Sequence, residues 1–127
     1  MIKMLLFIAA GGAFGAMARY LAISGIGAIV GMAFPYGTLV VNILGSFILG
    51  ALVEILALTW SPSQEVRALL VVGVLGAFTT FSAFSLDVVL QVERGHLVGA
   101  AIYILSSVTF SVLGLFAGLR LMRLILA

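Results

Sequence analysis

The sequence predicts an all-α membrane protein with four transmembrane helices in a single domain, residues 1–127. Of the 127 residues, 65% are hydrophobic and only 8% are charged, whereas soluble domains average about 45–50% apolar and about 25% charged residues. A segment inside lipid must satisfy its own backbone, as a helix or in a closed barrel. The apolar stretches are continuous and about twice the length of a roughly 10-residue barrel strand. We therefore expect helices.

Charged and turn-forming residues divide the chain into four apolar stretches. Each is long enough to cross a hydrocarbon core of about 30 Å, which takes about 20 helical residues. The first connection is expected to contain Gly25, Gly27, Gly31 and Pro35, and Ser63 in the second connection is placed to cap the third helix. The predicted spans are residues 3–24, 37–59, 66–93 and 97–124.

The charge pattern indicates membrane topology and no nucleic-acid partner. The six lysines and arginines are scattered, and there is no cysteine for disulfides or thiolate chemistry. Four spans place both termini and the second connection on one side of the membrane. Basic residues favour that side only modestly as the cytoplasmic one, which also permits insertion in both orientations. They are Lys3, Arg67, Arg120 and Arg123, against Arg94 and Arg19 on the opposite side.

Three ionisable residues, Arg19, Glu54 and Asp87, fall within the predicted spans. Each lies about five or six residues from a predicted helix end, roughly 8–9 Å at the helical rise. We therefore expect their side chains to reach the membrane interface as anchors. His96 falls in a turn, so no span has the midplane carboxylate or histidine that a proton relay requires.

The third span has the composition of a helix that is interrupted near its middle. From Arg67 to Arg94 a continuous helix would measure about 40 Å, longer than the hydrocarbon core of about 30 Å. Glycine and β-branched threonine, which weaken helices, gather around residues 73–82. A break there would free backbone carbonyls that need a cavity, a neighbouring helix or an ion.

Neutral polar side chains follow one face of the fourth span. Tyr103, Ser107 and Ser111 recur at i, i+4 and i+8, and Gly114 and Gly118 continue the same face. Serine and glycine commonly allow helices to pack closely. Because the tyrosine hydroxyl also needs a partner, the sequence equally permits a hydrated polar track.

Asn42 and a set of phenylalanines are the other notable interior groups. Thr38, Asn42 and Gly45 share a face of the second span, and burying an unpaired amide in hydrocarbon costs several kcal/mol. Asn42 therefore needs a partner: another helix, water or a transported species. Phe81 and Phe84 lie one helical turn apart, where they either pack against lipid and core or direct positive ring edges at an anion.

Three segments together resemble the Fluc (CrcB) family of small fluoride channels. They are GGAFGAMARY (11–20), GTLVVNILGSFILG (37–50) and GVLGAFTTFSAFS (73–85). The order of the motifs, the chain length and the number of spans also match. The resemblance implies an antiparallel, dual-topology homodimer with a broken third helix, two fluoride pores and a structural sodium ion at the dimer interface.

The resemblance also implies roles for individual residues. Asn42, Phe81 and Phe84 match the pore asparagine and the two phenylalanines that line the fluoride path, and Thr38, Tyr103, Ser107 and Ser111 match its polar track. Gly76 and Thr79 match the residues whose backbone carbonyls bind the sodium ion. Asp87 occupies a position where many members have glutamate. Arg19 of the first motif and Thr80 and Ser82 of the third match positions whose roles stay open.

The function implied is passive, selective fluoride export across the plasma (inner) membrane of a microbe. The expected partners are fluoride, a second copy of the chain and the lipid bilayer. One alternative is a small proton-coupled cation or multidrug exporter, which would use Glu54 or Asp87 as its essential carboxylate, and another is a non-transporting scaffold. With one loop histidine and no cysteine, an enzyme is not expected.

Overall fold

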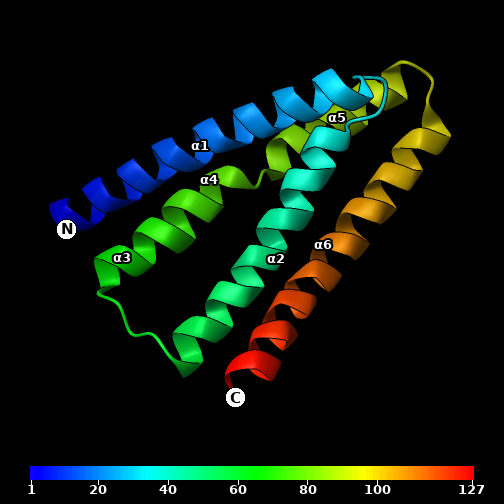
Figure 1. Cartoon of the computed structure of the whole chain (residues 1–127). Helices are drawn as coiled ribbons and strands as arrows, with labels where there is room; N and C mark the ends of the chain where they lie inside the picture. The colour runs from blue at the N-terminus through cyan, green and yellow to red at the C-terminus, as the bar shows by residue number, and fades with distance from the viewer.

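Four long apolar helical segments make up the structure, a computed structural model that describes all of residues 1–127 (Figure 1). The first two are α1 (Ile2–Val30) and α2 (Tyr36–Leu58). The third runs from Gln64 to Glu93 as several consecutive elements, and the fourth is α6 (Leu97–Leu126). Each is long and apolar enough to cross a membrane. The prediction of a helical, multi-pass membrane protein is therefore confirmed.

The third segment is not one uniform helix. It begins as α3 (Gln64–Ala68) and continues as η1 (Leu69–Leu75), a π-helix, followed by the short α4 (Gly76–Phe78) and by α5 (Phe81–Glu93). At the end of η1 the Gly76 N–H bonds to the carbonyl five residues earlier, which is the π-helical spacing. π-Helical turns are rare and occur frequently at functional sites.

The helix ends differ from the sequence expectation at one place. α1 continues through Gly25 and Gly27, which we expected in the first connection, because the apolar residues around them sustain the helix in spite of the low helix propensity of glycine. The helix ends where Gly31 adopts a φ of 87°, a conformation that favours glycine. The predicted cap at Ser63 is confirmed, since its Oγ accepts the backbone N–H of Val66 at 3.2 Å.

Glycines allow α2 and α6 to pack tightly side by side and in the same direction (Figure 1). A Cβ atom on Gly118 would collide with the Phe47 carbonyl of α2, and one on Gly50 would collide with the Leu115 carbonyl of α6. A Cβ on Gly114 would lie 3.3 Å from another α2 carbonyl. The close-packing role that the sequence permits for Gly114 and Gly118 is therefore observed.

An ion pair joins the C-terminal parts of the same two helices. Arg123 Nε donates to Glu54 Oε1 at 3.2 Å, and its Nη2 donates to Oε2 at 3.3 Å. The Glu54 residue is only 6% exposed and lies four residues before the end of α2, so its carboxylate is buried against Arg123 near a helix end. A buried carboxylate requires such a partner, because removing one member of a buried pair leaves an uncompensated charge.

A second close crossing holds α1 against η1. Cβ atoms on Gly11 or Gly15 would collide with the backbone at Leu69 or Val74, and one on Gly73 would lie 2.9 Å from Gly11 Cα. α1 also contacts α4, so it follows the third segment toward its middle (Figure 1). The two glycine-rich crossings thus bring α1, α2 and α6 around the centre of the third segment.

The α2–α6 crossing predicts that Gly118→Ala destabilises the protein. The added methyl group meets a backbone carbonyl that cannot move aside as a side chain would, and overpacking of this kind costs about 1–3 kcal/mol. Unfolding in mixed detergent micelles, followed by circular dichroism, measures the loss. Gly99→Ala in the same helix is the control, because its Cβ would meet only His96 Cβ at 3.8 Å. Equal stability of the two variants would contradict this account of the packing.

Candidate functional site

Thr79 and Thr80 form an extended interruption between α4 and α5. Their φ and ψ values are −85° and 157° for Thr79, and −154° and 117° for Thr80. Thr80 restarts the helix by accepting the Ala83 N–H on its Oγ1 at 3.1 Å, as threonine commonly does at a helix N-cap. The Thr79 hydroxyl donates backwards to the Leu75 carbonyl at 2.9 Å. Both threonine hydroxyls thus bond to backbone groups beside the interruption.

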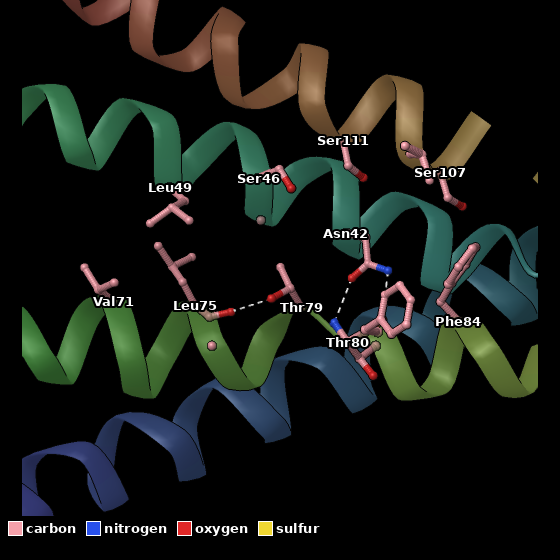
Figure 2. A pocket seen from close by; sticks show the side chains of 14 residues that line it. Asn42, Ser46, Leu49, Val71, Leu75, Thr79, Thr80, Phe84, Ser107 and Ser111 are labelled. Carbon is pink, nitrogen blue, oxygen red and sulfur yellow. Dashed lines mark hydrogen bonds between the residues drawn. The ribbon is translucent and has the colours of Figure 1, made fainter. Parts of the chain in front are cut away.

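Asn42 of α2 bonds to both backbone groups of Thr80 (Figure 2). Its Oδ1 accepts the Thr80 N–H at 2.8 Å, and its Nδ2 donates to the Thr80 carbonyl at 3.0 Å. One donor and one acceptor on the same partner fix the orientation of the amide. The partner that the sequence required for Asn42 is therefore a neighbouring helix, and one of the two amide N–H groups remains unused within the chain.

Several carbonyls at the interruption lose the donors that they would have in a continuous helix, and those of Gly76 and Thr79 are among them. The helical donor to the Gly76 carbonyl is the Thr80 N–H, which bonds to Asn42 instead. The helical donor to the Thr79 carbonyl is the Ala83 N–H, which bonds to the Thr80 side chain. The carbonyls of Gly76 and Thr79 are thus free of helical donors, as a backbone cation site requires.

Arg19 lies at the depth of the interruption and not near a helix end. Its Nε donates to the Ala77 carbonyl at 3.0 Å. The expectation that Arg19 is an interface anchor is therefore wrong, because that expectation placed the end of the first helix at residue 24, whereas α1 continues to Val30. The side chain bonds to the protein's own backbone.

A hollow of about 320 Å³ opens beside the interruption, between α2, the third segment and α6 (Figure 2). Most of the residues predicted for a pore or a cation site meet there. Ser46, which the sequence analysis did not single out, also lines it, and its position one helical turn after Asn42 was the available signal. The predicted residues that line the hollow are Asn42, Gly76, Thr79, Thr80, Phe81, Phe84, Ser107 and Ser111.

A buried hydroxyl in this hollow has no partner within the chain. Ser107 is 6% exposed, and its Oγ makes no hydrogen bond. Buried polar groups without partners are uncommon in native structures and call for an explanation. Ser107 therefore supplies a second unused hydrogen-bonding group to the hollow, beside the free N–H of Asn42.

Aromatic rings extend from the hollow toward the connection between α1 and α2. The Phe81 and Phe84 rings are 5.5 Å apart, and Phe84 lies 5.1 Å from the ring of Tyr103. The Phe34 ring then meets Tyr103 edge-on at 5.5 Å. Phe84 is buried, whereas Phe81 is 78% exposed on the surface of the single chain.

The remaining predicted residues lie outside the main hollow. Tyr103 is fully buried and donates its hydroxyl proton to Asp87 Oδ2 at 2.9 Å. Asp87 and Thr38 line a separate hollow of about 250 Å³ near the α1–α2 connection. Arg94 lines it too, which the sequence analysis did not predict. The Ser82 hydroxyl lies 3.5 Å from that of Thr80. Thr38 and Asn42, one turn apart on α2, thus line the two different hollows.

No group of three or more histidine, aspartate or glutamate side chains is arranged to bind a metal ion. Side-chain ligation by such a group therefore has no support in the structure. Gly76 and Thr79, whose carbonyls lack helical donors, both line the main hollow.

Comparison with known proteins identifies one family. The model of the family described as "CrcB-like protein, Camphor Resistance (CrcB)" matches residues 6–119. A protein of Rhodospirillum centenum is 55% identical over 96% of this chain and 97% of its own length, and one of Chelativorans is 53% identical over 96% and 98%. A protein of Agrobacterium fabrum is 52% identical over 91% and 93%. Each of these bacterial relatives carries the name "Fluoride-specific ion channel FluC".

The bonds between Asn42 and Thr80 predict that Asn42→Leu loosens the interruption. Leucine has a similar volume but leaves the Thr80 N–H and carbonyl unpaired, which costs about 1–3 kcal/mol per buried group and corresponds to exchange of the Thr80 amide at least about tenfold faster. Hydrogen–deuterium exchange with mass spectrometry measures this. The control is Ser46→Ala, which alters the same hollow without removing a side-chain bond. Unchanged exchange at Thr80 in Asn42→Leu would show that Asn42 does not stabilise it.

Proposed function

The chain belongs to the CrcB family of fluoride channels, and from this premise we propose that it forms a passive, fluoride-selective pore through which fluoride leaves the cytoplasm. Members of the family are transporters and not enzymes. The four apolar helices and the bacterial relatives indicate a multi-pass protein of the plasma membrane. A passive pore exports fluoride whenever the cytoplasmic concentration exceeds the external one.

The observation that carries the proposal is a hollow lined by unused neutral donors. Fluoride is small and strongly hydrated, so a pore must replace its water with hydrogen-bond donors and still release the ion. The free N–H of Asn42 and the unpartnered hydroxyl of Ser107 are such groups. Ser111 adds a further hydroxyl to the same hollow. Neutral donors of this kind favour both entry and release.

Phe81 and Phe84 are proposed to line the fluoride path with their ring edges. An aromatic ring carries partial positive charge at its edge, which attracts an anion without the strong binding of a full charge. The two rings are 5.5 Å apart and inclined by 49°, and both border the hollow. Thr38 and Tyr103 extend the polar path from Phe84 toward the second hollow.

A second copy of the chain is proposed to complete the pore as an antiparallel homodimer with two pores. In the single chain only 16 of 127 residues are buried, and Phe81 is 78% exposed. Four helices therefore leave the polar path open at the surface, where lipid would meet hydroxyl and amide groups. An inverted partner would close it, in the way inverted repeats build midplane sites in transporters.

A structural sodium ion is proposed at the carbonyls of Gly76 and Thr79, shared with the partner subunit. These carbonyls fit a cation because their helical donors bond elsewhere. When bound, the ion supplies positive charge that satisfies the freed carbonyls in the low dielectric of the membrane. Backbone oxygens of unwound helices are known ligands for Na⁺ in transporters.

The contacts of the membrane carboxylates give no support to the alternative of a proton-coupled exporter. Glu54 is paired with Arg123, and Asp87 accepts the Tyr103 hydroxyl. Neither carboxylate lines the main hollow. The family of the chain also points away from exporters of cations.

The proposal predicts fluoride efflux from liposomes that contain the purified protein. An electrode should record rapid release of fluoride down its gradient without a proton gradient, whereas chloride, measured under the same conditions, should stay inside. The physical reason is that the neutral donors lining the hollow can replace the water around the smaller fluoride ion better than the water around chloride. Protein-free liposomes are the control. Equal fluxes of both anions, or no fluoride flux, would contradict the proposal.

The ring-edge hypothesis predicts slower flux after Phe81→Ile or Phe84→Ile. Isoleucine retains apolar bulk but has no positive ring edge to attract the anion, so each substitution is expected to slow fluoride efflux severalfold. Efflux is compared with that of Phe116→Ile, which alters an exposed ring of α6 that does not line the hollow. Cross-linking establishes that the variants still assemble. Wild-type rates in both pore variants would show that the ring edges are dispensable.

A further inference from the structure

Arg19 is the one fully charged side chain that bonds to the interrupted part of the third segment. Its Nε donates to the Ala77 carbonyl at 3.0 Å, across 58 residues of sequence. In a continuous helix this carbonyl would accept the N–H of Phe81. The extended residues Thr79 and Thr80 separate Ala77 from Phe81. Arg19 thus replaces the Phe81 N–H as the donor to the Ala77 carbonyl, because the interruption moves Phe81 out of helical register.

The Ala77 carbonyl lies in the chain between two carbonyls that have no hydrogen-bond donor, those of Gly76 and Thr79. Those of Gly76 and Thr79 lose their helical donors to Asn42 and to the Thr80 side chain and gain none in the chain. If the Ala77 carbonyl were also free, it would compete with those of Gly76 and Thr79 for one cation, and the peptide that carries it would have no fixed orientation. The hydrogen bond from Arg19 removes the Ala77 carbonyl from this competition.

We propose that Arg19 is a positioning residue of the interruption, acting through the hydrogen bond from its Nε and not through its charge. By holding the Ala77 carbonyl, Arg19 fixes the Ala77–Phe78 peptide plane beside Gly76, while Asn42 fixes the Thr79–Thr80 plane through the Thr80 N–H, so that the Gly76 and Thr79 carbonyls remain directed to the cation. This inference rests on the sodium site of the proposed function. It assigns a role to the arginine of the first motif.

The proposal predicts that a side chain with the same donor and no charge can replace Arg19. Glutamine carries its Nε2 at the same number of bonds from Cα as the arginine Nε, and methionine has similar length with no donor. Arg19→Gln and Arg19→Met are both neutral, so they differ chiefly in the hydrogen bond. Arg120→Met is the matched control, because Arg120 is exposed and makes no side-chain hydrogen bond.

The experiment measures fluoride efflux from liposomes as a function of sodium concentration, with N-methylglucamine as the replacement cation. Arg19→Met is expected to need up to about tenfold more sodium for half-maximal efflux, in keeping with the loss of one ordinary hydrogen bond. Arg19→Gln and Arg120→Met are expected to stay within about twofold of wild type, a difference too small to reflect loss of such a bond. A general loss of stability would lower the amount of active protein without moving the sodium midpoint.

Hydrogen–deuterium exchange of the peptide that contains Thr80 and Ala83 gives a second measurement that does not depend on transport. Exchange is expected to be faster in Arg19→Met and unchanged in Arg19→Gln. The proposal is overturned if Arg19→Gln is as impaired as Arg19→Met, which would assign the role to the charge, or if both match wild type. Absence of wild-type fluoride flux would overturn the proposed function, and flux independent of sodium would overturn the cation site. In either case the exchange data still decide the role of Arg19.

Discussion

The structure depends on one constraint, which is that backbone polar groups in the interior of a membrane must have partners. The extended residues Thr79 and Thr80 interrupt the third segment and redirect several N–H and carbonyl groups at once. α2 contributes Asn42, which bonds to both backbone groups of Thr80, and α1 contributes Arg19, which bonds to the Ala77 carbonyl. Three of the four membrane segments are thereby joined at one point.

The glycines of the fold make this junction possible. A Cβ atom on Gly45 would collide with Thr79 Cγ2, so its absence lets α2 come close enough for Asn42, one turn away, to reach Thr80. Gly11 and Gly15 similarly let α1 lie against η1, which brings Arg19 to the depth of Ala77. The hydrogen bonds therefore depend on the close packing. The Asn42 and Arg19 side chains reach their partners because the helix backbones lie closer together than a Cβ atom at these glycines would allow.

Local patterns predicted much of this arrangement, and the failures have a common cause. Span number, the Ser63 cap and the need of Asn42 for a partner follow from composition and from the nature of single residues. The position of Arg19 was predicted from its distance to an expected helix end. That measure fails because α1 continues through glycines. The pairing of Glu54 with Arg123, 69 residues away, has no local signal in the sequence. The π-helical winding of η1 has no composition signal comparable to that of glycine or proline.

These corrections also change the reason why the hollow is neutral. The sequence suggested that charged residues avoid the membrane interior by lying at helix ends. The structure shows in addition that each is tied to a partner: Glu54 to Arg123, Asp87 to Tyr103, and Arg19 to a backbone carbonyl. None of them lines the main hollow. An anion in that hollow would therefore meet amide, hydroxyl and ring-edge groups and no full charge. Because a buried cation would bind a small anion tightly and slow its release, sequestering the charges favours conduction.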